Sequence, residues 1–155
     1  MATELYSTKI DIHVTPVWHR DPPLISIAFD NQIYEHTVEH PTTYHFESLQ
    51  KSGACVLQIE FYGKQDSDTV PEQVLDKALI IDSVTVNGIA HEKILLQSQY
   101  QPRYPEPWYS QQAVKPSPVL MGHNYLGWNG IWTLDIKVPA FRWLHEVLDL
   151  GWIYD

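Results

Sequence analysis

The residues best suited to bind a ligand or a metal ion are three aspartates in and after one polar segment: Asp66, Asp68 and Asp76. Residues 63–69 lie between two apolar, alternating stretches, so we expect a loop that a rigid β scaffold presents to solvent. Carboxylate oxygens on such a loop are ligands that Ca²⁺ prefers, with backbone carbonyls completing the shell. The alternative is a solvated acidic turn, in which Asp68 or Thr69 bonds local amide groups.

Aromatic residues gather in a second segment, the proline-rich stretch 101–118, and on a turn between two glycines. The prolines prevent a regular strand ladder, so we expect a long surface loop over 101–118. Tyr104, Trp108 and Tyr109 lie in this loop, and Trp128 lies on the turn. An exposed ring offers a flat face to a sugar or an anchor to a protein partner. Alternatively, the loop folds back and buries its rings as a cap on the scaffold.

Short alternating stretches must position these loops. Apolar and polar residues alternate over about eight or nine segments that turn residues separate, which is typical of β-strands. The predicted strands are residues 9–14, 23–29, 33–38, 44–49, 55–62, 78–86, 89–97, 119–126 and 131–138. Turn residues predict hairpins at 30–31 and 87–88, and tight connections between neighbouring strands at 51–53 and 127–130.

One helix is predicted near the end of the chain. Apolar residues recur at helical spacing over 141–148, Pro139 precedes them, and Gly151 lies where a C-terminal cap would. Trp132, Trp143 and Trp152 fall in apolar surroundings and are expected in the core.

The pattern as a whole predicts an all-β fold. We expect an antiparallel two-sheet β-sandwich of the jelly-roll kind with one short C-terminal helix. A length of 155 residues fits a single domain over residues 1–155.

Composition excludes several classes of partner. With 10 Lys plus Arg against 19 Asp plus Glu, the net charge of −9 repels nucleic-acid phosphates and anionic lipid headgroups. No apolar segment approaches the roughly 20 residues of a membrane helix, and the first residues lack a signal-peptide pattern. Cys55 lies in an apolar run and is expected to be a buried thiol, which suits a protein made in the reducing cytoplasm.

Catalytic interpretations find little support. Residues 36–40 spell the His-x-x-Glu-His of a zinc peptidase, but that motif works on a helix, whereas Thr37, Val38 and Pro41 favour a strand end. No serine or cysteine lies in a nucleophile setting. Folding could assemble a glycosidase-like pair of carboxyl groups, but the sequence alone does not show two of them meeting across a cleft. We therefore predict no enzyme activity and no catalytic residue.

Three stretches of the chain, residues 57–64, 66–69 and 76–82, together resemble the calcium-dependent, xylan-binding carbohydrate-binding modules. They follow the order of a strand, an Asp-Ser-Asp-Thr loop and a second strand. The resemblance implies a β-sandwich in which acidic loop residues hold calcium that bridges sugar hydroxyls. Carried over by position, it makes Asp68 and Asp76 the metal ligands, with Asp66 in support.

In size, acidity, lone cysteine and strand-rich pattern, the chain also looks like β-sandwich modules that bacteriophages make in the host cytoplasm and assemble onto virions. That resemblance implies a non-catalytic structural subunit, such as a capsid decoration, tail or fibre-adaptor protein, in a homo-oligomer or a larger complex. We take this as the principal functional hypothesis. The alternative is a module that recognises a glycan through its loop aromatics, with or without calcium.

Overall fold

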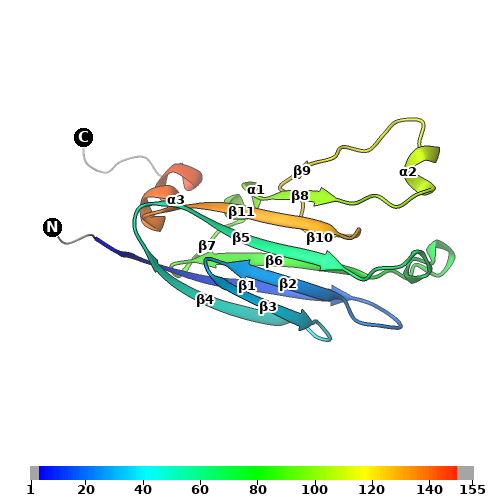
Figure 1. Cartoon of the computed structure of the whole chain (residues 1–155), viewed down its shortest axis with the longest axis horizontal. Coiled ribbons are helices and arrows are strands. Elements are labelled where there is room, and N and C mark those ends of the chain that lie inside the picture. The colour runs from blue at the N-terminus through cyan, green and yellow to red at the C-terminus, as the bar shows by residue number, and fades with distance from the viewer. Residues whose placement is uncertain (1–3, 150–155) are drawn as a thin grey trace.

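Two antiparallel β-sheets pack face to face in this protein, whose computed structural model describes residues 4–149 (Figure 1). The strands are β1 (Tyr6–Val17), β2 (Leu24–Phe29), β3 (Gln32–Thr37), β4 (Thr42–Gln50), β5 (Gly53–Tyr62), β6 (Ala78–Val86), β7 (Ile89–Ala90), β8 (Gln99–Pro102), β9 (Leu120–Met121), β10 (Tyr125–Leu126) and β11 (Gly130–Val138). One sheet has the order β10-β6-β1-β4, with β7 paired to β6, and the other has the order β3-β2-β5-β11-β8-β9. The predicted all-β sandwich is confirmed.

The core lies between the sheets because alternate residues of the facing strands point inward. Ile10 and Ile12 of β1 are fully buried, as are Leu57 and Ile59 of β5 on the other sheet. These residues belong to one apolar cluster that joins both layers. Hydrophobic burial between two pleated layers is therefore the main source of stability for the scaffold.

Three of the residues predicted to be buried are buried. Trp132 is fully enclosed on β11, Trp143 is 5% exposed, and Cys55 is 4% exposed. Burial raises the pKa of the Cys55 thiol to about 11, so this cysteine is protonated at neutral pH. Trp152 lies outside the described residues.

The predicted C-terminal helix is present as α3 (Ala140–Leu148). It ends at Asp149, which takes the left-handed conformation of a helix cap, while the predicted cap Gly151 lies outside the described residues. Two further short helices, α1 (Glu92–Leu96) and α2 (Trp108–Gln111), were not predicted. Among residues 4–149, none of the helices has the length and apolar character needed to cross a membrane.

Two predicted strands are interrupted. The prediction over 89–97 was wrong beyond β7, because the His91 side chain accepts a hydrogen bond from the Lys93 amide and begins α1. The apolar Ile94 then enters the core from a helix rather than a strand. The prediction over 119–126 was wrong in the middle, where Gly122 has a φ of 65° and separates β9 from β10.

Two connections predicted to join neighbouring strands instead cross between the sheets. Residues 51–53 link β4, which pairs with β1, to β5, which pairs with β2 and β11. Residues 127–130 link β10 in one sheet to β11 in the other. The hairpins predicted at 30–31 and 87–88 are confirmed, since β2 pairs with β3 and β6 pairs with β7.

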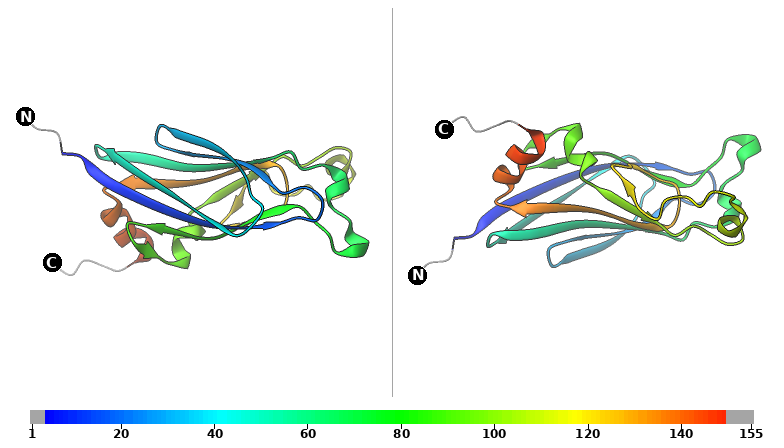
Figure 2. Two further views of the ribbon diagram at one scale, coloured as in Figure 1. Left: turned by 90° about the horizontal axis from the view of Figure 1, so that it is seen from below. Right: turned by 90° about the horizontal axis from the view of Figure 1, so that it is seen from above.

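The sandwich has two different ends (Figures 1 and 2). Helices α1 and α3 lie at one end. At the other end, which we call the loop end, lie α2 and two short 3-10 turns, η1 (Asp66–Asp68) and η2 (Pro71–Gln73). The predicted aromatic and acidic loops therefore extend from the same end of the scaffold.

Candidate functional site

Three of the chain connections at the loop end build the candidate site: residues 63–77 between β5 and β6, residues 103–119 between β8 and β9, and residues 127–129 between β10 and β11. They meet because β5, β11 and β8 are consecutive neighbours in one sheet. Strands β5 and β8 end, and β11 begins, on this edge. The sheet order thus brings together segments that lie about 40 and 65 residues apart in the chain.

Asn129 ties the three connections to one another. Its side-chain oxygen accepts from the Lys64 amide at 2.9 Å, and its side-chain nitrogen donates to the Lys64 carbonyl at 2.9 Å. The Asn129 carbonyl accepts from the Arg103 amide at 2.7 Å. Next to it, Gly130 has no room for a side chain, because an added Cβ would lie 2.4 Å from the Gln101 carbonyl oxygen.

The backbone of Trp128 is fixed to the core by Tyr100. The Tyr100 hydroxyl donates to the Trp128 carbonyl and accepts from the Trp128 amide at 3.1 Å. Tyr100 is fully buried, and this burial raises the pKa of its phenol. The turn that carries Trp128 is therefore fixed to a buried strand residue as well as to the neighbouring connections.

The four loop aromatics predicted as binding residues form one cluster. Trp108 and Trp128 have ring centroids 4.8 Å apart. Tyr104 lies 5.7 Å from Trp108, 5.8 Å from Trp128 and 5.9 Å from Tyr109 by ring centroids. All four are half-buried. We call these four residues the aromatic cluster. Their rings pack on each other and keep part of their surface in solvent, so they are neither fully exposed nor buried as a cap, the two alternatives that the sequence left open.

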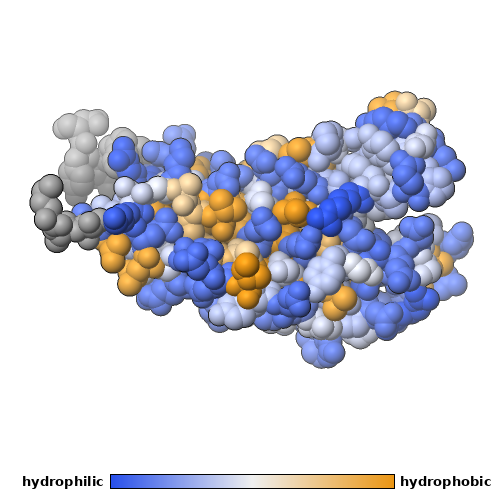
Figure 3. Space-filling model, viewed as in Figure 1, coloured by the Kyte–Doolittle hydropathy of each residue, from blue (hydrophilic) through white to orange (hydrophobic). Residues whose placement is uncertain are grey.

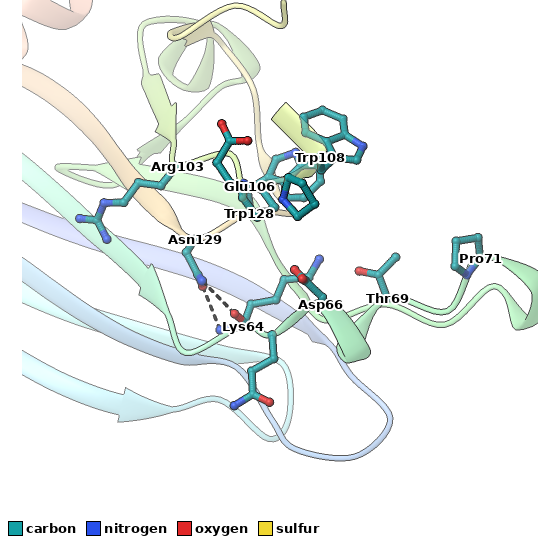
Figure 4. Close-up of a pocket in the computed structure, with 12 residues that line it drawn as sticks. Lys64, Asp66, Thr69, Pro71, Arg103, Glu106, Trp108, Trp128 and Asn129 are labelled. Atoms are coloured by element: carbon teal, nitrogen blue, oxygen red, sulfur yellow. Dashed lines mark hydrogen bonds between the residues drawn. The ribbon is translucent and has the colours of Figure 1, made fainter. Parts of the chain in front are cut away.

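A hollow of about 320 Å³ opens beside the aromatic cluster. Trp108 and Trp128 line one side of it, and Asp66, Thr69 and Pro71 line the other (Figure 4). The space-filling view shows the notch between the lobe that carries α2 and the lobe formed by the β5–β6 connection (Figure 3). The charged lining residues are Lys64, Asp66, Arg103 and Glu106. An open apolar wall facing polar groups is the common form of a small-ligand site.

Asp76 accepts hydrogen bonds on both carboxylate oxygens. Its Oδ1 accepts from Lys64 Nζ at 2.7 Å and from the Thr69 hydroxyl at 2.8 Å, and its Oδ2 accepts from the Tyr125 hydroxyl at 2.7 Å. Burial raises the pKa of Asp76, but the hydrogen bonds outweigh burial and hold that pKa below its ordinary value. For Tyr125, burial and then the Asp76 carboxylate both raise the phenol pKa. Asp76 is thus an ionised anchor of the loop end.

Asp68 is buried, with 3% of its surface exposed. Its Oδ2 accepts from the Gln65 amide at 2.8 Å, and its Oδ1 lies 3.4 Å from Arg20 Nη2. Lys77 is also buried and places its Nζ 3.9 Å from Asp68 Oδ2. Asp68 therefore bonds a local amide, as the alternative interpretation predicted, but it is buried beside two basic side chains rather than solvated.

Asp66, Asp68 and Asp76 do not form the calcium site that the sequence predicted. Asp66 is exposed on η1, while Asp68 and Asp76 each face a lysine. Within residues 4–149, no three His, Cys, Asp or Glu side chains come together to hold a metal ion. The donor set does not fit calcium, because the ammonium and guanidinium groups already neutralise the carboxylates and would repel a second cation.

The histidine motif at 36–40 lies on a strand end, as its β-branched residues predicted. His36 is in β3 and stacks on Tyr44, with ring centroids 4.2 Å apart. Burial lowers the His36 pKa. A strand places successive side chains on opposite faces, so the motif does not have the helical geometry of a zinc peptidase.

The sequence did not identify Lys64, Arg103, Tyr125 or Asn129 as site residues. Asn129 was interpreted only as part of a turn, although a polar residue on a glycine-flanked crossing is a natural side-chain bridge. Lys64 directly follows Gly63 at the end of a strand. That position indicates a loop residue, but it does not indicate that Lys64 pairs with Asp76. Lys64, Arg103 and Asn129 come together through the order of β5, β11 and β8 in one sheet. Tyr125 lies on β10 of the other sheet and joins them through its hydrogen bond to Asp76.

Neither a scan against protein-family models nor a search of curated proteins gives a match. A search of solved structures finds vCBM60, in a study that describes circular permutation as a link between two families of calcium-dependent carbohydrate-binding modules. The match covers 82% of this chain and 89% of that chain, with a TM-score of 0.52 and 13% sequence identity.

This likeness shows the fold. The chain is a β-sandwich similar to that of a calcium-dependent carbohydrate-binding module, which confirms the fold implied by the first resemblance noted from the sequence. The comparisons give no support to the virion resemblance. The alternative hypothesis, glycan recognition, is therefore better supported than the principal one.

Proposed function

We propose that this protein is a non-catalytic glycan-binding module that holds a sugar chain in the hollow at its loop end. The observation that carries the proposal is the pair of half-exposed indoles, Trp108 and Trp128, whose ring centroids lie 4.8 Å apart on one wall of the hollow. A pyranose has an apolar face that can lie on an indole, and its hydroxyl edge can bond polar groups opposite. The likeness to a carbohydrate-binding module supports the proposal.

The polar groups in the hollow suit hydroxyls. Arg103, Glu106 and Asn129 come from the aromatic side of the hollow, whereas Gln65 and Thr69 come from the β5–β6 connection. Amide, hydroxyl and charged groups together both donate and accept hydrogen bonds, as sugar hydroxyls do. The lining thus provides orientation for the hydroxyl edge while the indoles bury the apolar face.

The charges of the hollow favour a neutral glycan over one that carries uronic acids. Lys64 is paired with Asp76, and Arg103 lies 2.7 Å from the Glu60 carboxylate. Asp66 and Glu106 add two carboxylates to the lining. A sugar carboxylate would meet these anions while both cations already have partners, which weakens its binding.

Binding rather than catalysis fits the state of the carboxylates. Asp68 and Asp76 accept hydrogen bonds and face basic groups, so their role is to hold the loops in place. A glycoside hydrolase needs one carboxyl group that gives up a proton and another that attacks or activates water. We assign neither step to any residue of this site.

Affinity electrophoresis through gels that contain neutral polysaccharides, xylan, β-glucan and mannan, tests the proposal. We expect at least one polysaccharide to retard the wild-type protein. Trp108→Ala and Trp128→Ala should each lower affinity about tenfold or more, which corresponds to roughly 1.4 kcal/mol. Both variants should remain folded, because neither ring is fully buried.

Phe141→Ala is the matched control. Phe141 is an exposed aromatic residue, 58% accessible, on α3 at the opposite end of the molecule. Its loss should leave retention unchanged. Equal retention of the wild type and both tryptophan variants would contradict the proposal, as would an unretarded wild-type protein across the neutral polysaccharides.

A further inference from the structure

Lys64 lies where the three connections of the loop end meet. Its side chain is 9% exposed, and its Nζ donates to Asp76 Oδ1 at 2.7 Å and to the Gly127 carbonyl at 2.6 Å. The same Nζ lies 5.6 Å from the centroid of the Trp128 ring. A nearly buried cation thus sits directly beside an indole that lines the hollow.

Lys64 also borders a second, smaller hollow of about 260 Å³, lined in part by Asp76, His123 and Tyr125. It therefore stands between the two hollows. An ammonium group has three N–H bonds, and within residues 4–149 only Asp76 and Gly127 accept from this one. The third N–H is left for an acceptor in the hollows, such as a hydroxyl.

Both hydrogen-bond acceptors of this ammonium group are oxygens. The Asp76 carboxylate and the Gly127 carbonyl contact it, and the Thr69 and Tyr125 hydroxyls share the same carboxylate. Carboxylate, carbonyl and hydroxyl oxygens are the donors that a hard cation takes. A cation is thus already part of the protein here, bonded to one carboxylate and one carbonyl.

The neighbouring carboxylate is equally engaged. Asp68 is buried against Lys77 and Arg20 and accepts the Gln65 amide. A calcium ion between the two aspartates would have to displace hydrogen bonds and approach Lys64 and Lys77, both less than 10% exposed. Repulsion between calcium and these ammonium groups would be stronger here than at the surface, because a partly buried site screens charges less than water does.

We propose that the Lys64 ammonium group is the built-in cation of the loop end, that it occupies the oxygen donors a metal ion would need, and that it makes the site independent of calcium. Lys64 holds Asp76 and Gly127 together, which positions Trp128, and its third N–H donates to a ligand hydroxyl. The statement about the ligand rests on the proposed glycan-binding function, whereas the statement about calcium does not.

The first test uses calcium alone on the wild-type protein. Thermal melting is recorded in millimolar calcium chloride and in EGTA, and we expect the same melting temperature in both. A calcium site filled at a hundred times its dissociation constant would raise the melting temperature by roughly 5–10 °C. A rise of that size in calcium would overturn the proposal, and this comparison depends on no variant.

The second test replaces the cation. Lys64→Met keeps the length of the side chain but removes the ammonium, and we expect a melting temperature lower by roughly 2–10 °C. Lys137→Met is the matched control, because Lys137 is exposed on β11 at a distance from the loop end, and its variant should melt like the wild type. A Lys64→Met protein that melts like the control would count against the proposal.

The third test repeats gel retention on xylan, β-glucan and mannan in calcium and in EGTA. Retention of the wild type should be the same in both, and Lys64→Met should be retained less than Lys137→Met. Loss of retention in EGTA would overturn calcium independence. If none of the gels retards the wild type, the proposed glycan function fails, while the melting comparison still decides whether Lys64 excludes calcium.

Discussion

The two ends of the sandwich are closed in different ways. At the helical end, α3 packs Trp143 and Leu144 into the core, and both side chains are almost fully buried. At the loop end, polar pairs such as Lys64–Asp76 hold the connections, and the rings of Trp108 and Trp128 remain half-exposed. Buried apolar side chains stabilise the fold and leave little surface for a ligand. Ion pairs and hydrogen bonds instead fix the loops and leave part of each aromatic ring exposed, so that a ligand can bury it on binding.

The two ends also differ in how strongly pH and salt affect their stability. Burial of Trp143 and Leu144 involves no ionisable group, so it is insensitive to pH and only weakly affected by salt. The loop end relies on the ionised Asp76 and on ion pairs that join Asp76 and Asp68 to basic side chains. We therefore expect variants of the two ends to separate stability from binding.

The largest effect is expected from Trp143→Ala at the helical end. Removing a buried indole leaves a cavity and should lower the free energy of unfolding by about 3–5 kcal/mol. Urea denaturation measures this change. Retention on polysaccharide gels should stay at the wild-type level under conditions where the variant is folded. A folded Trp143→Ala protein that is no longer retained would break the separation between the two ends.

A smaller effect is expected from Asp76→Ala at the loop end. The variant leaves Lys64 without its anion and removes the acceptor for Thr69 and Tyr125, which should cost about 1–3 kcal/mol of unfolding free energy. It should also weaken retention, because Lys64 and Gly127 lose their fixed arrangement beside Trp128. Asp135→Ala is the matched control, since Asp135 is exposed on β11 away from this network.

The same variant has a distinct pH signature. Because the folded pKa of Asp76 lies below its unfolded value, its stabilisation is complete above the unfolded pKa, about 3.9, and is lost as pH falls through the lower folded pKa. Acid titration of stability should therefore be shallower for Asp76→Ala than for Asp135→Ala. Parallel titrations of the two variants would show that Asp76 does not hold the loop end by its charge.

Local sequence patterns were enough to predict the scaffold. Residues 78–86 are rich in β-branched residues, which predicted a strand, and β6 spans the same range. The short helix α1 was not predicted. It has only five residues, and Ile94 and its apolar neighbours suit a strand equally well, so tertiary packing determines which of the two forms. The connection at 127–130 resembled a hairpin turn, because its glycines allow either a hairpin or a crossing between sheets. Only the pairing of β10 with β6 shows that it is a crossing.

The site was predictable in its parts but not in its chemistry. Trp108 and Trp128 were identified as loop aromatics, yet their contact follows from β8 lying beside β11. Asp68 and Asp76 were identified as carboxylates able to hold a cation. That the cation would be a lysine ammonium could not be predicted, because Lys64 meets Asp76 only once the β5–β6 connection has folded.

The most direct test of the central claim is a nuclear magnetic resonance titration of the wild-type protein with neutral oligosaccharides released from xylan, β-glucan and mannan. We predict that the largest shifts fall on the indole N–H groups of Trp108 and Trp128 and on the amides of residues 64–69, 103–109 and 127–129. Shifts concentrated on the outer faces of the sheets or at α3, or spectra that no oligosaccharide changes, would contradict it.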